Sequence, residues 1–250
     1  MIIVRSALFN LVFFAVSFFM TLLASLVRLL SPDHVLRVAV WWARILVAAA
    51  RVICGIRLEV SGRERIAPGA ALIASRHQSA FDTFVWLTLL PRCCYVVKDE
   101  LLHIPLFGGL ITKAGMIAVD RSAGPSAIRA LLRAADRVAL EQRQIVIFPE
   151  GTRGGPERTG ALQPGVAALA ARTGLPVIPV ATNSGTCWGR KAFLKRPGII
   201  RIAIGQPIPA GTGRPELMRV LQAAIGVLDA PTCIDKQAPR GTVDKSVQRS

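Results

Sequence analysis

The sequence is poor in the residue types from which metal sites, disulfide frameworks and nucleic-acid interfaces are built. Its 250 residues include three histidines, five cysteines and a single tyrosine. The histidines are scattered and no two cysteines have the C-x-x-C spacing, so no metal site is expected. The odd, unpaired set of cysteines favours reduced thiols in a reducing compartment. Without a zinc-ligand spacing, an aromatic RNA-binding signature or a basic DNA-reading helix, no nucleic-acid partner is expected.

Acidic residues are also few. Lys and Arg number 31 against 15 Asp and Glu, which gives a formal net charge of +16. Such an excess of positive charge indicates an anionic partner. With nucleic acid disfavoured, an acidic membrane surface and a small phosphate-bearing substrate are the expected partners, and charge alone does not choose between them.

Charge is missing altogether from residues 7–27, ALFNLVFFAVSFFMTLLASLV. This run is long and apolar enough for a bilayer-spanning helix, so we expect it to enter a membrane. A cleaved signal peptide is disfavoured, because the run is too long and no small-x-small site ends it. Basic residues flank both ends, so whether the helix spans or re-enters stays open.

The next segment, residues 33–56, combines an apolar surface with a narrow basic stripe. Its arginines recur every seven residues and therefore fall on one side of a helix, at Arg37, Arg44 and Arg51. This pattern is typical of an interfacial helix whose arginines reach toward lipid phosphates, and a core helix with a solvated arginine face is the alternative. A turn at residues 31–33 predicts a membrane-associated helical hairpin over residues 1–56.

Short β-like runs then alternate with helical segments over residues 57–230. The runs lie at 57–60, 70–75, 94–98, 115–119, 144–148, 176–181 and 199–205, and apolar residues recur at helical spacing over 125–142, 165–172 and 216–228. This alternation predicts an α/β fold, with a mostly parallel mixed sheet flanked by helices. Residues 231–250 are polar and aperiodic, and we expect a disordered tail.

The stretch SRHQSAFDTFVW, residues 75–86, places His77 five residues before Asp82. On a straight helix the two side chains would face about 140° apart, so they meet only if the chain bends between them. Ser79 predicts such a bend, because Ser-x-x-Asp before an apolar run resembles a helix N-cap with an acid at the third helical position. The alternative is that Asp82 only caps the helix and that His77 is an incidental loop residue.

Polar residues follow three of the predicted strands, at 76–82, 119–121 and 148–153. The carboxyl ends of strands in α/β sheets are where ligands bind. With Val-Ile-Pro-Val at 177–180, this series resembles the glycerolipid acyltransferase family over residues 57 to about 210. The matching blocks are His-x4-Asp at His77 and Asp82, Gly-x-Ile-x-Val-Asp-Arg at 115–121, and Phe-Pro-Glu-Gly-Thr-Arg at 148–153.

The resemblance implies an enzyme that moves a fatty acyl group from an acyl thioester to the sn-2 hydroxyl of 1-acylglycerol-3-phosphate, giving phosphatidate. His77 would remove the hydroxyl proton, and Asp82 would fix the tautomer of the ring and stabilise the imidazolium. The alcohol attacks directly, which agrees with the lack of a G-x-S-x-G nucleophile turn.

The resemblance also places the glycerol phosphate at Arg121, Glu150, Gly151, Thr152 and Arg153. Arg153 would grip the phosphate bidentately, Arg121 would add a second charge, and the backbone amides around Gly151 and Thr152 would add donors. Glu150 would bind an acceptor hydroxyl or brace Arg153, with a structural salt bridge as the alternative.

The expected partners follow from this chemistry: membrane lipid, a lyso-lipid acceptor, and acyl-CoA or acyl carrier protein as co-substrate, without a bound cofactor. We expect the catalytic domain on the cytoplasmic face of the inner membrane. One departure from the family is Gln163, within Leu162–Gly165, where a Lys or Arg is usual. It leaves open another acceptor such as lyso-ornithine lipid. A membrane-adhering protein with an inactive site is disfavoured, because His77, Asp82, Glu150 and Arg153 are all intact.

Overall fold

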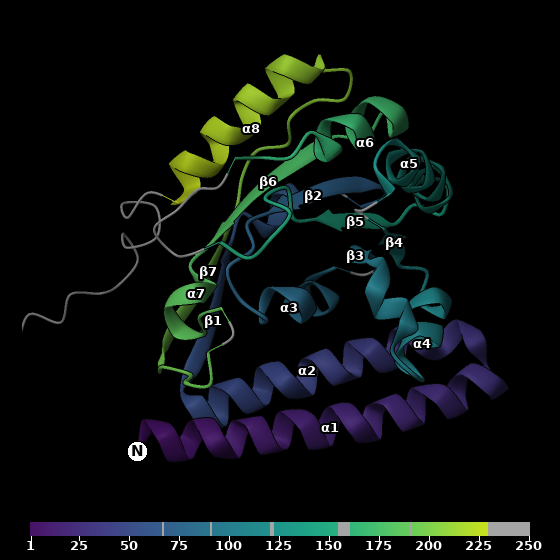
Figure 1. Cartoon of the computed structure of the whole chain (residues 1–250). Helices are drawn as coiled ribbons and strands as arrows, with labels where there is room; N and C mark the ends of the chain where they lie inside the picture. Colours follow the sequence, from purple (N-terminus) through teal and green to yellow (C-terminus); the bar gives the residue numbers. More distant parts are fainter. Residues whose placement is uncertain (67, 91, 121–122, 155–160, 191, 230–250) are drawn as a thin grey trace, which may run out of the picture.

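The computed structural model describes residues 1–66, 68–90, 92–120, 123–154, 161–190 and 192–229. The expectations at Arg121 and for the tail at 231–250 lie outside these residues. A seven-stranded sheet with the order β1-β7-β6-β2-β5-β3-β4 lies between two layers of helices (Figure 1). The strands are β1 (Ile56–Ser61), β2 (Ala71–Ser75), β3 (Cys93–Lys98), β4 (Ile117–Val119), β5 (Gln144–Ile147), β6 (Val177–Thr182) and β7 (Gly198–Ile204).

Neighbouring strands run parallel except for β6 and β7, which are antiparallel. The expected mostly parallel mixed sheet is therefore confirmed, with strand bounds close to those predicted. Cys93 and Cys94 show the alternation of side chains along β3, since one packs in each of the two hydrophobic cores on the two faces of the sheet. Both thiols are free, and burial raises the pKa of Cys94 to about 11.

The first helical layer consists of α1 (Ile2–Leu30), α2 (Val35–Cys54), α3 (Asp82–Leu89) and α4 (Phe107–Lys113). Helices α1 and α2 lie antiparallel beneath α3 (Figure 1) and are joined by a 3₁₀ turn at Pro32–His34. Phe9 of α1 and Leu46 of α2 are fully buried in the same core as Phe84 and Trp86 of α3. The hairpin thus packs directly on the rest of the fold, and the domain boundary at residue 56 stays a prediction.

The second layer covers the opposite face with α5 (Pro125–Leu140), α6 (Gly165–Thr173) and α8 (Arg214–Asp229). Their apolar stripes bury Leu131, Leu169 and Leu221 against the sheet. Helix α4 and the four-residue α7 (Ser184–Cys187) were not predicted from the sequence. Both are too short for the apolar spacing of a helix to repeat.

Arg143 ties three strands together at the amino ends of β3 and β5. Its Nη2 donates to the carbonyls of Cys93 (2.9 Å) and Ala114 (2.8 Å), and its Nη1 donates to that of Gly115 (3.2 Å). Gly115 adopts a left-handed φ of 68°, and a Cβ there would lie 2.2 Å from Nη1. The glycine that opens the block at 115–121 is therefore required by backbone conformation and by this buried guanidinium.

We predict that Gly115→Ala destabilises the protein by about 1–3 kcal/mol through the left-handed backbone and the clash with Arg143. Thermal unfolding of the detergent-solubilised protein should show a Tm lower by several degrees. Gly226→Ala is the matched control, because its surroundings are open and alanine favours the interior of helix α8. Equal Tm values for the two variants would contradict the role of Gly115.

Candidate active site

The candidate site forms where the carboxyl ends of the central strands meet. Strand β2 lies between β5 and β6 and is parallel to both. Ala74 of β2 pairs with Ile147 of β5. His77 and Glu150 follow these two residues at the same distance along the chain. The parallel pairing therefore brings two blocks of polar residues, far apart in sequence, to one edge of the sheet.

His77 and Asp82 are in contact. The Nδ1 atom of His77 lies 3.2 Å from Oδ2 of Asp82, and the same oxygen accepts the backbone N–H groups of Gln78 and Ser79 at 2.8 Å each. The Asp82 side chain is 2% exposed. Three donors converging on one buried oxygen wrap the chain around the carboxylate, which is the bend that the sequence requires.

The bend differs from the predicted N-cap in one respect. Helix α3 begins at Asp82 itself, and the Ser79 hydroxyl accepts the N–H of Phe81 instead of capping the third helical residue. Only the reverse half of a capping box forms, in which the acid reaches back to the N–H of Ser79. The prediction of Ser79 as the helix N-cap is wrong, because the Asp82 carboxylate organises the turn.

Contacts on three sides fix the His77 ring. The Phe148 ring stacks on it with centroids 4.1 Å apart, and Arg153 Nε donates to His77 Nε2 at 3.3 Å. Because the Asp82 carboxylate accepts at Nδ1, that nitrogen carries the hydrogen and Nε2 is left with its lone pair. The Tyr95 hydroxyl donates to the Asp82 carbonyl (3.5 Å), and burial raises its pKa well above the usual value, so the phenol stays neutral.

The loop at 148–154 is attached to the loop that carries His77. The Gly154 N–H donates to the His77 carbonyl at 2.8 Å. Gly151 has a left-handed φ of 74°, and its N–H donates to the Phe148 carbonyl at 3.0 Å. The Gly151 amide, expected as a phosphate donor, thus already closes a turn in this structure. Thr152, which follows this turn, is exposed.

Glu150 does not brace Arg153. Its Oε1 accepts from Nε of Arg76 at 3.2 Å, and both side chains are buried. Among the described residues no ion pair joins Glu150 to Arg153, so the salt-bridge alternative describes its contact. Burial is the main cause that raises the pKa of Glu150, while Arg76 lowers it. Sequence reasoning missed Arg76, which adjoins His77, and the stacking of Phe148.

The remaining expectations concern metals and the block at 115–121. Within the described ranges no three His, Cys, Asp or Glu side chains come together as a metal site. Asp120 is exposed just after β4, and the neighbouring Arg121 lies outside the described residues. The structure therefore brings together His77, Asp82, Glu150 and Arg153, and leaves the position of Arg121 open.

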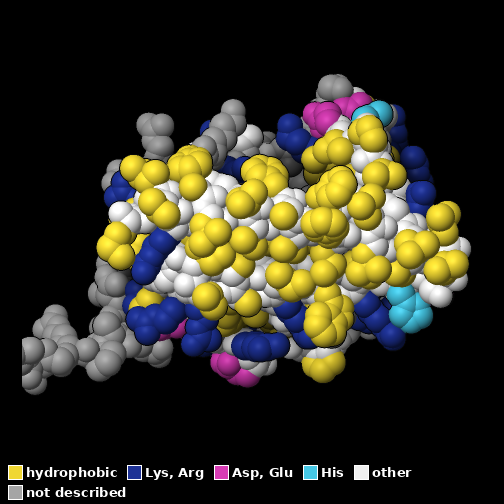
Figure 2. Space-filling model, turned by 90° about the horizontal axis from the view of Figure 1, so that it is seen from below, with side chains coloured by type: hydrophobic (Ala, Val, Ile, Leu, Met, Phe, Trp, Pro, Cys, Tyr) yellow, Lys and Arg dark blue, Asp and Glu magenta, His cyan; other side chains and the backbone are white. Residues whose placement is uncertain are grey.

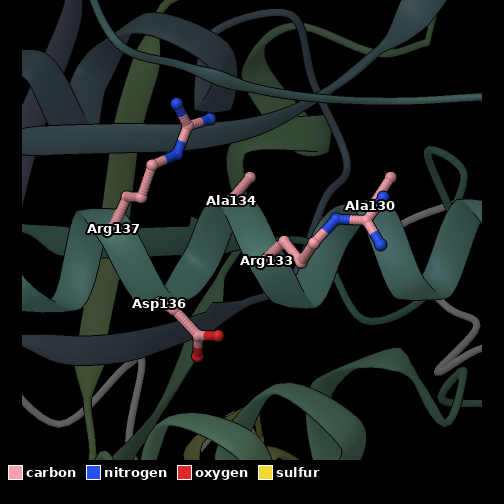
Figure 3. Close-up of a pocket in the computed structure, with 5 residues that line it drawn as sticks. All are labelled: Ala130, Arg133, Ala134, Asp136 and Arg137. Carbon is pink, nitrogen blue, oxygen red and sulfur yellow. The ribbon is translucent and has the colours of Figure 1, made fainter.

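A shallow hollow of about 470 Å³ lies on α5, away from these residues. Its lining comes from Ala130, Arg133, Ala134, Asp136 and Arg137, which α5 alone contributes (Figure 3). Asp136 pairs with Arg172 of α6 at 2.8 Å. Helix α5 is thus amphipathic, because its apolar side packs on the sheet and its arginines on the other side are exposed.

Comparison with known proteins identifies the family. The acyltransferase family profile matches residues 57–183. The 1-acyl-sn-glycerol-3-phosphate acyltransferase of Pseudomonas aeruginosa is 37% identical over 169 residues, which cover 68% of this chain and 66% of that protein. The enzyme of the same name from Limnanthes alba is 33% identical over 62% of this chain and 55% of its own length. The chain thus spans about half to two thirds of these curated relatives.

The fold has a solved counterpart as well. The crystal structure of the 1-acyl-sn-glycerophosphate acyltransferase from Thermotoga maritima superimposes with a TM-score of 0.72 at 20% identity, over 92% of this chain and 96% of that one. On the evidence of the matched residues 57–183, which contain the whole candidate site, the chain belongs to the acyltransferase family.

Proposed function

We propose that this protein is a 1-acylglycerol-3-phosphate O-acyltransferase, which moves a fatty acyl group from an acyl thioester to the sn-2 hydroxyl and forms phosphatidate. The observation that carries the proposal is the pair of contacts on the His77 ring, Asp82 at Nδ1 and Arg153 at Nε2. His77 can accept a proton, and Arg153 beside it can bind a phosphate. The lipid substrate, 1-acylglycerol-3-phosphate, carries its free hydroxyl and its phosphate on adjacent carbons. The names of the curated relatives support the same substrate.

His77 acts as the general base of the reaction. Its Nε2 takes the proton of the sn-2 hydroxyl while the hydroxyl oxygen attacks the carbonyl carbon of the thioester. The new C–O bond forms, the C–S bond breaks, and the imidazolium returns the proton to the leaving sulfur. Asp82 holds the reactive tautomer and stabilises the imidazolium, and two backbone N–H donors hold its carboxylate in place.

Arg153 binds the phosphate of the acceptor. In the structure its Nε donates to the nitrogen that must accept the substrate proton. A phosphate offers charge-assisted, bidentate hydrogen bonds, which are stronger than one N–H donated to a neutral imidazole. Acceptor binding therefore draws the guanidinium away and frees Nε2, so the base becomes available when its substrate is present.

Further acceptor contacts come from the same two loops. Thr152 adds its backbone N–H beside Arg153, Arg121 adds a second positive charge, and the turn at Gly151 shapes the loop around the phosphate. Glu150 is paired with Arg76, the residue before His77. The donor is acyl-CoA or acyl carrier protein, and the catalytic domain lies on the cytoplasmic face of the inner membrane, where both donors occur. Four buried free cysteines among the described residues support a reducing compartment.

The exposed side of α1 supports membrane docking. Among the described residues α1 is the one helix that is long and apolar enough to cross a membrane, judged by length and composition. Seen from below, this face is broadly hydrophobic, with Lys and Arg gathered along its margin (Figure 2). Its exposed large apolar side chains include Leu8, Leu11, Phe14, Phe18, Phe19, Leu22, Leu23, Leu26, Leu29 and Leu30.

The polar side chains of α1 favour entry into one leaflet over a full crossing. The Ser6 hydroxyl accepts the N–H of Lys195 at 2.9 Å, and the Lys195 ammonium pairs with Asn10. The same ammonium lies 4.9 Å from the Trp188 ring, against which Phe9 packs edge-on. These contacts hold the amino half of α1 lengthwise against the loop before β7. We propose that α1 and α2 lie in the cytoplasmic leaflet with the α1 face toward the acyl chains.

His77→Ala should lower the rate of acyl transfer by about 10² to 10⁴, the usual contribution of a general base. Asp82→Asn should also lose most activity. The amide oxygen of asparagine can still accept the two backbone N–H groups, but an uncharged amide does not stabilise the imidazolium. The measurement is transfer from acyl-CoA and from acyl carrier protein to lysophosphatidate. His103→Ala is the matched control, since its side chain is 76% exposed. Near wild-type turnover in folded His77→Ala protein would refute the mechanism.

Arg153→Ala should lower acceptor kcat/KM roughly tenfold to a hundredfold, since a hydrogen bond to a charged group contributes about 1.5–3 kcal/mol. Arg153→Lys should recover part of the loss, because lysine keeps the charge without the planar fork. Without acceptor, Arg153→Ala should hydrolyse the thioester faster than the wild type, because Nε2 is free. Arg133→Ala on α5 is the control.

Two outcomes would contradict this assignment. A raised donor KM with an unchanged acceptor KM in Arg153→Ala would place the arginine at the phosphates of the thioester carrier. Preference of the wild type for lyso-ornithine lipid over lysophosphatidate would show that the acceptor is a different lyso-lipid.

Replacing Leu11, Phe18 and Phe19 by serine should weaken membrane binding at least tenfold, because burial of each side chain contributes about 1.5–3 kcal/mol. Flotation with vesicles of anionic phospholipid measures the bound fraction. Ile128→Ser with Leu140→Ser is the matched control, since both residues are exposed on α5 across the sheet. Equal flotation of the triple variant and the wild type would show that another surface binds lipid.

A further inference from the structure

Arg76 is a buried cation next to the proposed base. It follows the last residue of β2 and precedes His77, and its side chain is 0% exposed. Its Nε donates to Glu150 Oε1 at 3.2 Å, and its Nη1 pairs with Asp229, the last residue of α8. A buried charge is unfavourable unless it is paired and hydrogen-bonded. Arg76 therefore joins three elements, the ends of β2 and α8 and the loop after β5.

Glu150 depends on this contact. Its Oε2 is buried and has no hydrogen-bond partner among the described residues, so Arg76 holds the carboxylate through one oxygen. Burial raises the pKa of Glu150, while Arg76 and the backbone N–H of His77 lower it. The Glu150 carboxylate thus faces both the side chain of Arg76 and the backbone of the proposed base.

The spacing between His77 and Arg153 follows from the same connection. Glu150 belongs to the loop that carries Arg153, and Arg76 belongs to the segment that carries His77. A further link is the Gly154 N–H, which donates to the His77 carbonyl. A side-chain ion pair and a backbone hydrogen bond therefore fix the two loops against each other on either side of the contact between Arg153 and His77.

We infer that Arg76 is a positioning residue, which through Glu150 holds the His77 loop at the distance from Arg153 that the reaction needs, and that Asp229 anchors Arg76 from α8. This inference rests on the proposed function, because it assigns His77 and Arg153 their roles. Arg76 itself touches no substrate. It gives the carboxyl-terminal end of α8, remote in sequence from the family blocks, a part in arranging the site.

The test compares Arg76 with Arg143, the buried arginine at the opposite end of the strands. Arg76→Met should lower kcat roughly tenfold to a hundredfold, since a displacement of about 1 Å at a reacting group has an effect of this size. Arg76→Lys should lower kcat less, because lysine keeps the positive charge but cannot bind Glu150 and Asp229 with a planar guanidinium. Asp229→Asn should lose least, because Glu150 remains paired. Arg143→Met should lower Tm and leave kcat unchanged.

A second readout does not depend on activity. The chain has three histidines, of which His34 and His103 are exposed, so ¹⁵N-histidine NMR of the full chain in micelles resolves the His77 ring. The wild type should show His77 with its hydrogen on Nδ1. Arg76→Lys and Asp229→Asn should shift its signals toward the tautomer mixture of free histidine, and Arg143→Met should leave them unchanged.

The inference is overturned if the Arg76 and Asp229 variants lower Tm while kcat and the His77 signals match the wild type, or if Arg143→Met changes the signals equally. If Arg76→Met does not fold, the kcat values and His77 signals of Arg76→Lys and Asp229→Asn test the inference. Failure of the proposed function looks different. Wild-type protein would then transfer no acyl group to lysophosphatidate, while the His77 signals would still respond to Arg76 and not to Arg143.

Discussion

The parallel pairing of β2 with both β5 and β6 is the constraint on which the rest of the structure depends. Parallel strands of this kind are buried on both faces, and all five residues of β2 are buried. The chain therefore leaves β2 inside the protein, where its polar groups need partners. Asp82 binds the turn after His77, Arg76 finds two carboxylates, and the Gln78 amide oxygen accepts the N–H of Gly185. The site thus consists of polar residues that follow a buried strand and are held there by partners inside the protein.

Periodicity predicted the strands and the long helices because each repeats its pattern over enough residues to be recognised. The Cys93–Cys94 pair of β3 shows the alternation that makes a strand recognisable, since the two thiols lie on opposite faces of the sheet. Helices α4 and α7 escaped prediction because a single turn or two contains no repeat. Ser79 was assigned the wrong role, since a sequence pattern does not tell whether the hydroxyl or the acid organises a turn.

The contacts of the site also divide into those that could be predicted from the sequence and those that could not. His77 and Asp82 are close in the chain, so their contact could be predicted from the bend between them. Arg76 and Glu150 are 74 residues apart, so their contact could not be predicted without knowing that β2 pairs with β5. Part of the large positive charge has the same explanation. Arg76 and Arg143 serve internal carboxylates and carbonyls, whereas the arginines of α5 face solvent. Net charge therefore overstates the surface available to an anionic partner.

The shared core of α1, α2 and α3 has a thermodynamic consequence. Phe9 is fully buried beside Trp188 while the opposite side of the same helix carries a row of exposed phenylalanines and leucines. In the proposed docking, one side of α1 lies in the protein core and the other in lipid, so the bilayer binds the folded protein over a surface that the fold arranges. By mass action, such a ligand stabilises the fold it binds. The bilayer would then shift the equilibrium toward the folded chain, in addition to holding the proposed enzyme near its lipid substrate.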